Sequence, residues 1–587
     1  MKFVRKSVSI LLALTMLLGV SAVAGSAETE VESYPIILIH GLGQSNVRLF
    51  DENNELVLDD DGNTITNFPP PIDVMSLVSD LLFPLLLSLF FQTDVGLVDA
   101  IRTAANNLLP AFKMDENGFP TMNMRVETYP NSLADCTDAQ KQFIYSTLPV
   151  QDLAKQVGED KIYYFAYDSL GNNDEITERL YKMIGDVKEE HDSPKVNIAA
   201  VSLGGTFMNS LLEYHPDVVS SLNSIVYVIA ALDGSRIVGD IYTGNIAQND
   251  ADLYRDLFPA LVPGYLGSLI NVAIRLFPKS LLHGIFDSLV NALAGDLISY
   301  STTMWSLCPS GDYEEARAMW LMDGKHDEIL EQTDRYYQAQ KNSDANILAA
   351  QAAGVKVYAI AEYNVPLYSI AGSYKEYNAD GIIHLDSTSL GATSGYVDTP
   401  LPEDYKQQKH TDHNYMSPDR IVDASTGALP DYTFYFKNQA HESTAQCDVI
   451  MSLVVRLLTA DEYEDVFSMP EWPQFNHGRR TRSLRNDLLP QAQSIDAAAL
   501  APEDAAELEA AIQQAETMLK TTIVVPEETD AAIERLQAIL VKLGKIEASK
   551  EDTTAQILDP IFKFVDDALY WLRGARGFSD PFWVRWQ

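Results

Sequence analysis

Residues 196–205 read VNIAAVSLGG, an apolar run typical of a buried strand that ends at a serine, Ser202, between small residues. A serine at the tip of a sharp strand-to-helix turn has a strained backbone, so the residues two before and two after it must be small. Ala200 and Gly204 fill these two positions. Residues 206–213 then carry apolar side chains at helical spacing, which predicts a helix with Ser202 at its N-terminus. The pattern predicts a nucleophile elbow, and a βα turn of any doubly wound sheet is the simpler alternative.

Other β-type runs alternate with helical patterns along the chain. Besides the strand before Ser202, we expect strands at residues 34–39, 161–168, 224–231, 355–361 and 432–436. Strands that alternate with helices predict an α/β domain with a mainly parallel sheet. The first run ends in HGLG, residues 40–43, where a glycine lets the backbone turn so that the Leu42 N–H could face a bound carbonyl oxygen. An ordinary strand-end turn with His40 as a packed ring is the alternative.

A serine hydroxyl becomes a good nucleophile when a histidine takes its proton, so we searched for a base downstream of Ser202. His441 follows a strand and precedes a helix, which is the loop position at the carboxyl edge of a parallel sheet where such a base belongs. His410 and His413 lie in a long polar loop, and His384 lies in an apolar run where a structural histidine is expected. We therefore favour His441 as the base.

The histidine needs a carboxylate that orients it and stabilises its positive form. Asp380 lies in NADG, residues 378–381, after the strand at 355–361, and Asp233 precedes a glycine one strand earlier. Both give the chain order serine, acid, histidine. We choose Asp380, with Asp233 as the rival, and an ordinary Asp-Gly turn is the alternative at either position.

Four motifs in this order resemble a known family. HGLG at 40–43, AVSLGG at 200–205, NADG at 378–381 and His441 together are similar to secreted α/β-hydrolases of the lipase and lecithin:cholesterol-acyltransferase-like kind, over residues 31–460. The chain departs from many relatives in having Ala200 where they have glycine. The resemblance implies an α/β-hydrolase fold that needs no cofactor or metal. The site residues that it implies are Ser202 as nucleophile, His441 as base, Asp380 as acid, and the N–H groups of Leu42 and Leu203 as oxyanion hole.

The chain of 587 residues is too long for one core, so we expect several parts. Its start is basic, then apolar, then rich in small residues, as in a cleavable secretory signal. Two apolar stretches, 72–91 and 257–298, indicate cap insertions that we expect to meet over the serine. Residues 496–544 resemble two-helix modules of surface proteins in Gram-positive bacteria. The expected parts are a signal peptide at 1–27, a hydrolase domain at 28–470 with helical cap insertions at about 46–150 and 240–350, a linker at 471–495, a two-helix spacer or surface-binding module at 496–546, and an aromatic amphipathic tail at 547–587.

The net charge of −41, from 42 basic and 83 acidic residues, argues against nucleic acid as a partner. We expect no transmembrane anchor, because Asp73, Asp80 and Pro84 interrupt the first apolar stretch. The three cysteines are too few for a disulfide framework, no metal-ligand spacing such as HExxH appears, and one disulfide or a structural calcium ion stays open.

These observations lead us to expect a secreted serine hydrolase, extracellular or bound to the cell surface, that cleaves carboxylic esters of lipids through an acyl-enzyme. Its partner would be a lipid or another hydrophobic ester, with cell-surface or interfacial contact through the C-terminal region. Acyltransferase or phospholipase activity at the same triad is an alternative. A non-catalytic surface-binding protein on a hydrolase scaffold is a second alternative, from a different class.

Overall fold

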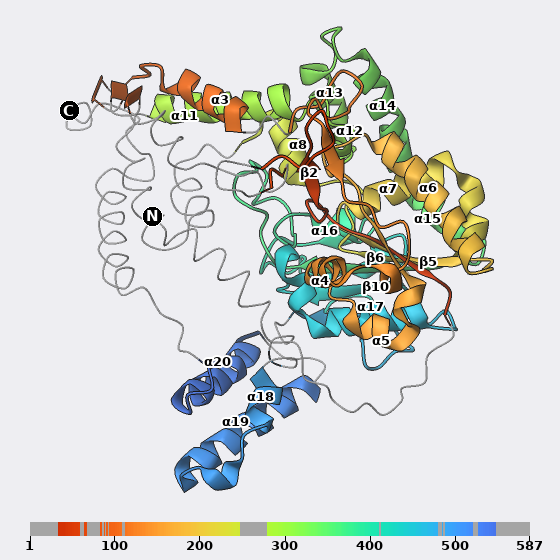
Figure 1. Cartoon of the computed structure of the whole chain (residues 1–587), viewed down its shortest axis with the longest axis vertical. Helices are drawn as coiled ribbons and strands as arrows, with labels where there is room; N and C mark the ends of the chain where they lie inside the picture. The colour runs from red at the N-terminus through yellow and green to blue at the C-terminus, as the bar shows by residue number, and fades with distance from the viewer. Residues whose placement is uncertain are drawn as a thin grey trace.

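The computed structural model of the chain describes most of residues 33–546 (Figure 1). The described ranges are 33–58, 64–66, 93–108, 112–246, 279–409, 413–478, 488–520 and 526–546, with single positions at 83, 84, 87, 88, 90, 91 and 484. The expected signal peptide, the aromatic tail and most of the apolar stretch 72–91 therefore lie outside the described residues.

A sheet of seven strands, all parallel, forms the centre of the protein, in the order β11-β10-β7-β6-β5-β1-β4. The prediction of an α/β chain with a mainly parallel sheet is confirmed. Its strands are β1 (Ile36–Ile39), β4 (Ile162–Phe165), β5 (Val196–Val201), β6 (Leu222–Val228), β7 (Lys356–Tyr363), β10 (Thr433–Lys437) and β11 (Phe475–His477).

Both faces of the sheet are covered, because successive side chains of one strand belong to different cores. In β1, Ile37 and Ile39 join one buried cluster, whereas Ile36 and Leu38 join the other. The first cluster lies under α6 (Asn173–Glu190), α7 (Gly204–Tyr214) and α15 (Ser343–Ala352), and the second under α5 (Gln151–Val157) and α17 (Asp448–Thr459). Figure 1 shows these two helical layers on opposite sides of the strands.

One strand of the sheet lies in the range that the sequence analysis assigned to a linker. The strand β11 pairs with β10 through the register Tyr435 to Phe475 and Lys437 to His477. Its three residues, Phe-Asn-His, have neither an apolar run nor a clear alternation. A strand this short at a sheet edge leaves no pattern that sequence alone can identify.

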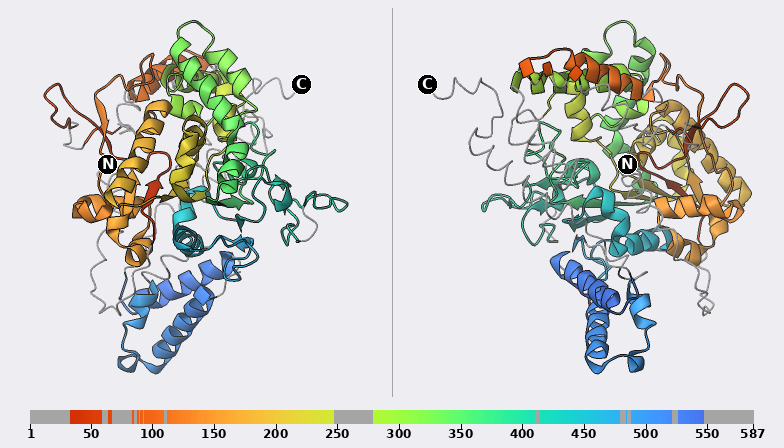
Figure 2. Two further views of the ribbon diagram at one scale, coloured as in Figure 1. Left: turned by 90° about the vertical axis from the view of Figure 1, so that its right-hand side faces the viewer. Right: turned by 60° about the vertical axis from the view of Figure 1, so that its left-hand side comes forward.

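Several elements lie outside the two helical layers. The strands β2 (Val47–Leu49) and β3 (Met124–Val126) form an antiparallel pair. The helices α8 (Arg236–Thr243), α13 (Tyr313–Trp320) and α14 (Asp327–Lys341) stand near the carboxyl edge of the sheet, and α3 (Leu97–Leu108) and α11 (Lys279–Val290) extend away side by side (Figures 1 and 2). Helix α3 follows the first apolar stretch, 72–91, in the sequence, and helix α11 lies within the second, 257–298. The contact between the two helices therefore brings these two regions of the chain together.

A separate small core lies near the C-terminal end of the described chain. It is formed by α18 (Leu489–Gln493), α19 (Pro502–Lys520) and α20 (Pro526–Lys542), which share buried Leu508, Leu536 and Leu540. These helices project from the rest of the protein (Figure 2). Among the helices of the described ranges, none has the length and hydropathy that a bilayer crossing requires.

Candidate active site

Ser202 stands at the turn between β5 and α7, at the carboxyl edge of the sheet. Its φ is +52°, a left-handed backbone conformation that residues other than glycine rarely adopt. The backbone holds it there from both sides, because the Ser202 N–H donates to Val228 O at 3.0 Å and the Ser202 carbonyl accepts from the Ala231 N–H at 2.9 Å. The strained elbow expected from the sequence is present.

The small residues after the serine are required by close packing. A Cβ added at Gly204 would lie 2.9 Å from the carbonyl oxygen of Ile39, and one at Gly205 would lie 2.7 Å from the Cβ of Ala230. Both separations are shorter than ordinary contacts, so helix α7 can approach β1 and the end of β6 only where these side chains are absent. The sequence pattern thus reflects the way the helix leaves the sheet.

A chain of hydrogen bonds joins Ser202, His441 and Asp380. The Ser202 Oγ lies 3.0 Å from His441 Nε2, and His441 Nδ1 lies 2.7 Å from Asp380 Oδ2. Because an ionised carboxylate can only accept, Nδ1 carries the ring proton and Nε2 is left to accept from the serine hydroxyl. The second oxygen, Asp380 Oδ1, accepts from the N–H groups of Ile382 at 2.9 Å and Ile383 at 2.7 Å.

The electrostatics of this chain favour a basic histidine. Asp380 has no exposed side-chain surface, and His441 has 14%. Burial lowers the pKa of His441, but the charge and hydrogen bond of Asp380 and the nearby charge of Glu442 raise it, and the net pKa shift is upward. The ring can therefore take a proton from Ser202 and hold it beside Asp380.

The other candidates for base and acid have different partners in the described chain. Asp233 Oδ1 accepts from the Ser310 N–H at 2.9 Å, and its own N–H donates to Ser387. His384 is fully buried, and burial lowers its pKa. His413 stacks on Phe467 at 4.2 Å between ring centroids, and residue 410 lies outside the described residues.

The turn HGLG comes close to the serine. A Cβ at Gly41 would lie 3.1 Å from Ser202 Cβ and 3.5 Å from its Oγ, so a side chain at this position would crowd the serine. The turn is held by Gln44, whose Oε1 accepts from the Gly41 N–H at 2.7 Å, and by Ser169, whose Oγ accepts from the Gly43 N–H at 2.8 Å. No hydrogen bond from the N–H of Leu42 or Leu203 to another described residue is present, so both donors are available.

His40 is a packed ring that supports this turn. It is fully buried and stacks on Tyr167, with ring centroids 4.0 Å apart. Its Nδ1 donates to Gly41 O at 2.6 Å, and its Nε2 accepts from the Ser45 hydroxyl. Burial lowers the pKa of His40 to about 3 despite the Gly41 hydrogen bond, so the ring stays neutral. No sequence pattern marks Gln44, Ser45, Tyr167 or Ser169 as supports of this turn, because their contacts form only in the folded chain.

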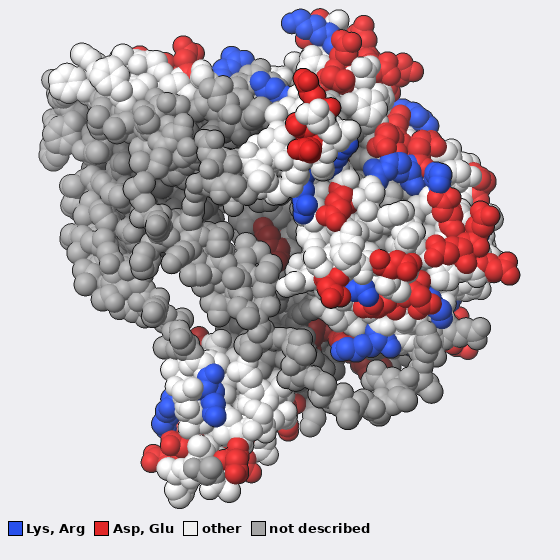
Figure 3. Space-filling model, in the orientation of Figure 1, with Lys and Arg blue, Asp and Glu red and all other residues white. Residues whose placement is uncertain are grey.

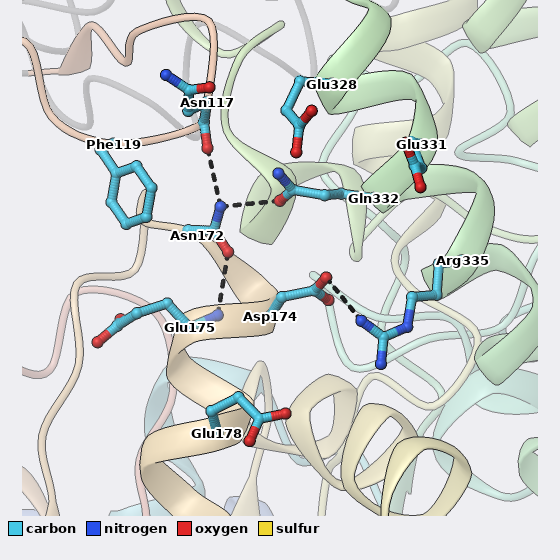
Figure 4. A pocket seen from close by; sticks show the side chains of 10 residues that line it. All are labelled: Asn117, Phe119, Asn172, Asp174, Glu175, Glu178, Glu328, Glu331, Gln332 and Arg335. Carbon is cyan, nitrogen blue, oxygen red and sulfur yellow. Dashed lines mark hydrogen bonds and ion pairs between the residues drawn. The ribbon is translucent and has the colours of Figure 1, made fainter.

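A polar cavity of about 520 Å³ lies elsewhere, between the start of α6, helix α14 and the loop at 117–119 (Figure 4). Its polar contacts include Arg335 with Asp174 at 3.0 Å and the Asn172 amide, which donates to Gln332 at 2.8 Å. Its remaining lining residues are Asn117, Phe119, Glu175, Glu178, Glu328 and Glu331. Acidic side chains, with basic ones among them, gather on this side of the molecule (Figure 3), and none of Ser202, His441 and Asp380 lines the cavity.

Within the described residues, no group of three or more His, Cys, Asp or Glu side chains is arranged to hold a metal ion. The chain matches no protein-family model, and no curated protein is significantly similar to it. The function of the protein is therefore inferred from the geometry of the site.

Proposed function

We propose that the protein is a serine hydrolase with an α/β-hydrolase fold that cleaves carboxylic esters through the triad Ser202, His441 and Asp380. The single observation that supports this most strongly is the continuous hydrogen-bond chain from Asp380 through His441 to a strained serine. The three residues stand at the carboxyl edge of one parallel sheet in the chain order serine, acid, histidine, which is the order of this fold.

In the proposed reaction the Ser202 Oγ attacks the ester carbonyl carbon while His441 Nε2 takes its proton. The carbonyl oxygen becomes an oxyanion, which the N–H groups of Leu42 and Leu203 stabilise. The bond to the alcohol oxygen then breaks, and His441 returns the proton to the leaving alcohol. Water attacks the acyl-enzyme with the same proton transfers, and the acid and free Ser202 are released.

We propose lipid esters as the substrates, with acyl transfer or phospholipid cleavage as alternatives at the same triad. The apolar stretches 72–91 and 257–298 support this, because they supply far more apolar surface than a short ester needs. Phe83, Phe90 and Phe91, which precede α3 in the sequence, are 69%, 80% and 59% exposed. Secretion is proposed from the expected N-terminal signal.

The experiment that tests the activity compares p-nitrophenyl ester hydrolysis by the parent, Ser202→Ala and a control, Ser220→Ala. Ser220 is exposed, and its hydroxyl donates to the nearby Asp217 carbonyl at 2.9 Å. Loss of a serine nucleophile typically lowers turnover by about a millionfold, so the first variant should be inactive and the control should match the parent. Equal hydrolysis by the parent and Ser202→Ala would contradict the proposal and favour a non-catalytic scaffold.

A further inference from the structure

A buried acid beside the triad has no part in the reaction described above. Glu362 lies in β7 and has no exposed surface. Its Oε1 lies 2.7 Å from the Thr444 Oγ1, and its Oε2 has no hydrogen-bond partner among the described residues. Thr444 belongs to the short 3₁₀ helix His441–Gln446, which begins at the histidine of the triad. Glu362 thus connects the strand before Asp380 to the segment that holds His441.

The two hydrogen bonds at the Thr444 hydroxyl indicate whether Glu362 is protonated. The Thr444 Oγ1 lies within hydrogen-bond distance of both Glu362 Oε1 and the His441 carbonyl oxygen, at 2.7 and 2.9 Å. A hydroxyl has one proton, and an ionised carboxylate and a carbonyl can only accept. If Glu362 is protonated, it donates to Thr444, which then donates to the His441 carbonyl, and both short contacts are satisfied.

The surrounding charges favour the same protonated state. The groups that face Glu362 are Asp380 from the loop after β7, and His441 and Glu442 from the 3₁₀ helix. Burial raises the pKa of Glu362 to about 8, and the charges of Asp380 and Glu442 raise it too, whereas the Thr444 hydrogen bond and the charge of His441 oppose this shift. An uncharged Oε2 is also easier to leave buried without a partner than a carboxylate oxygen is.

We propose that neutral Glu362 is a positioning residue, which donates through Thr444 to the main chain of His441 and so holds the imidazole between Ser202 and Asp380. This inference rests on the proposed hydrolase function. Ionisation of Glu362 removes the donor and adds a negative charge beside Asp380, so turnover falls on the alkaline side. The site is thereby limited to the pH range in which Glu362 keeps its proton.

The test follows kcat and KM from pH 6 to pH 10 in the parent, E362Q, E362L and E442Q. E362Q keeps a donor but has no proton to lose, so the ratio of kcat at pH 9.5 to kcat at pH 7 should rise above that of the parent. E362L has no donor, and its kcat should fall about ten- to a hundredfold with little change in KM, as expected for a misplaced base. E442Q removes a charge that raises the pKa of Glu362 but leaves the Thr444 contact in place, so its alkaline limb should move to lower pH.

A second pair of variants tests the connection itself. T444V should lower kcat like E362L, and T444S should restore it, because serine keeps the hydroxyl. Thermal unfolding of each variant checks that it is folded, and active-site titration of Ser202 with a fluorophosphonate separates the two proposals. Suppose that the parent reacts with the probe. If E362Q then keeps the parent's alkaline limb, or if E362L keeps the parent's kcat, the role of Glu362 is overturned and the proposed hydrolase function still stands. A parent that does not react overturns the hydrolase itself.

Discussion

Replacing Asp380 by asparagine should disable the site by reversing one hydrogen bond. Asp380 Oδ1 accepts two backbone N–H groups, from Ile382 and Ile383, so the amide oxygen of an asparagine must occupy this position. Its NH₂ group then occupies the position of Oδ2, 2.7 Å from His441 Nδ1. Two donors cannot share that bond, so the ring proton moves to Nε2, where it blocks proton transfer from Ser202.

We expect this wrong tautomer to lower kcat by about ten thousandfold, which corresponds to about 5.4 kcal/mol of transition-state stabilisation. The assay is ester hydrolysis over a range of pH, with thermal unfolding to show that Asp380→Asn is folded. Residual activity should have its acidic limb at lower pH, because loss of the Asp380 charge lowers the pKa of His441. Asp233→Asn is the matched control and should be mild. A crippled Asp233→Asn beside a mild Asp380→Asn would refute the assignment of the acid.

Three further predictions follow from the site and its packing. The acidic limb of kcat/KM should have its midpoint above pH 6.5, because the pKa of His441 is raised and activity is lost as the ring gains a proton; a midpoint below 6 would contradict this. Gly205→Ala should lower the free energy of unfolding in urea by about 1 to 3 kcal/mol, because its Cβ would lie 2.7 Å from Ala230 Cβ. Gly185→Ala in α6, with open space around it, should instead be neutral or stabilising, and equal effects would contradict the packing argument. Among p-nitrophenyl esters, acyl chains of about eight carbons or more should be preferred, since each buried methylene contributes roughly 0.8 kcal/mol; a steady fall from acetate onward would exclude an acyl groove.

The central sheet could be predicted from sequence because its strands are buried on both faces. Runs such as residues 34–39 and 225–231 are continuously apolar, a pattern that short surface elements lack. The strand β11 lacks it, with only Phe-Asn-His, and was not predicted. The meeting of the apolar stretches 72–91 and 257–298 over Ser202 stays a prediction, because much of both stretches lies outside the described residues.

Only the part of the candidate site that lies in local sequence motifs could be predicted. Ser202 and the HGLG turn have recognisable neighbours, but Asp380 and Asp233 both precede a glycine after a strand, and their hydrogen bonds distinguish them only in the folded chain. Gln44 and Ser169 support the turn from positions that no spacing rule connects. Glu362 left one usable signal, a carboxylate at the end of an otherwise apolar strand, and its role becomes visible only beside Thr444.

The proposal that Ser202 is an activated nucleophile is tested most directly by covalent labelling. A fluorophosphonate reacts with a serine whose proton a neighbouring histidine removes, and it leaves a stable phosphonyl group on that oxygen. Peptide mass spectrometry of the treated protein should find one label per chain, on Ser202, and labelling should be lost in Ser202→Ala and strongly slowed in His441→Ala. A parent that stays unlabelled, or a label on any other residue, would contradict the account.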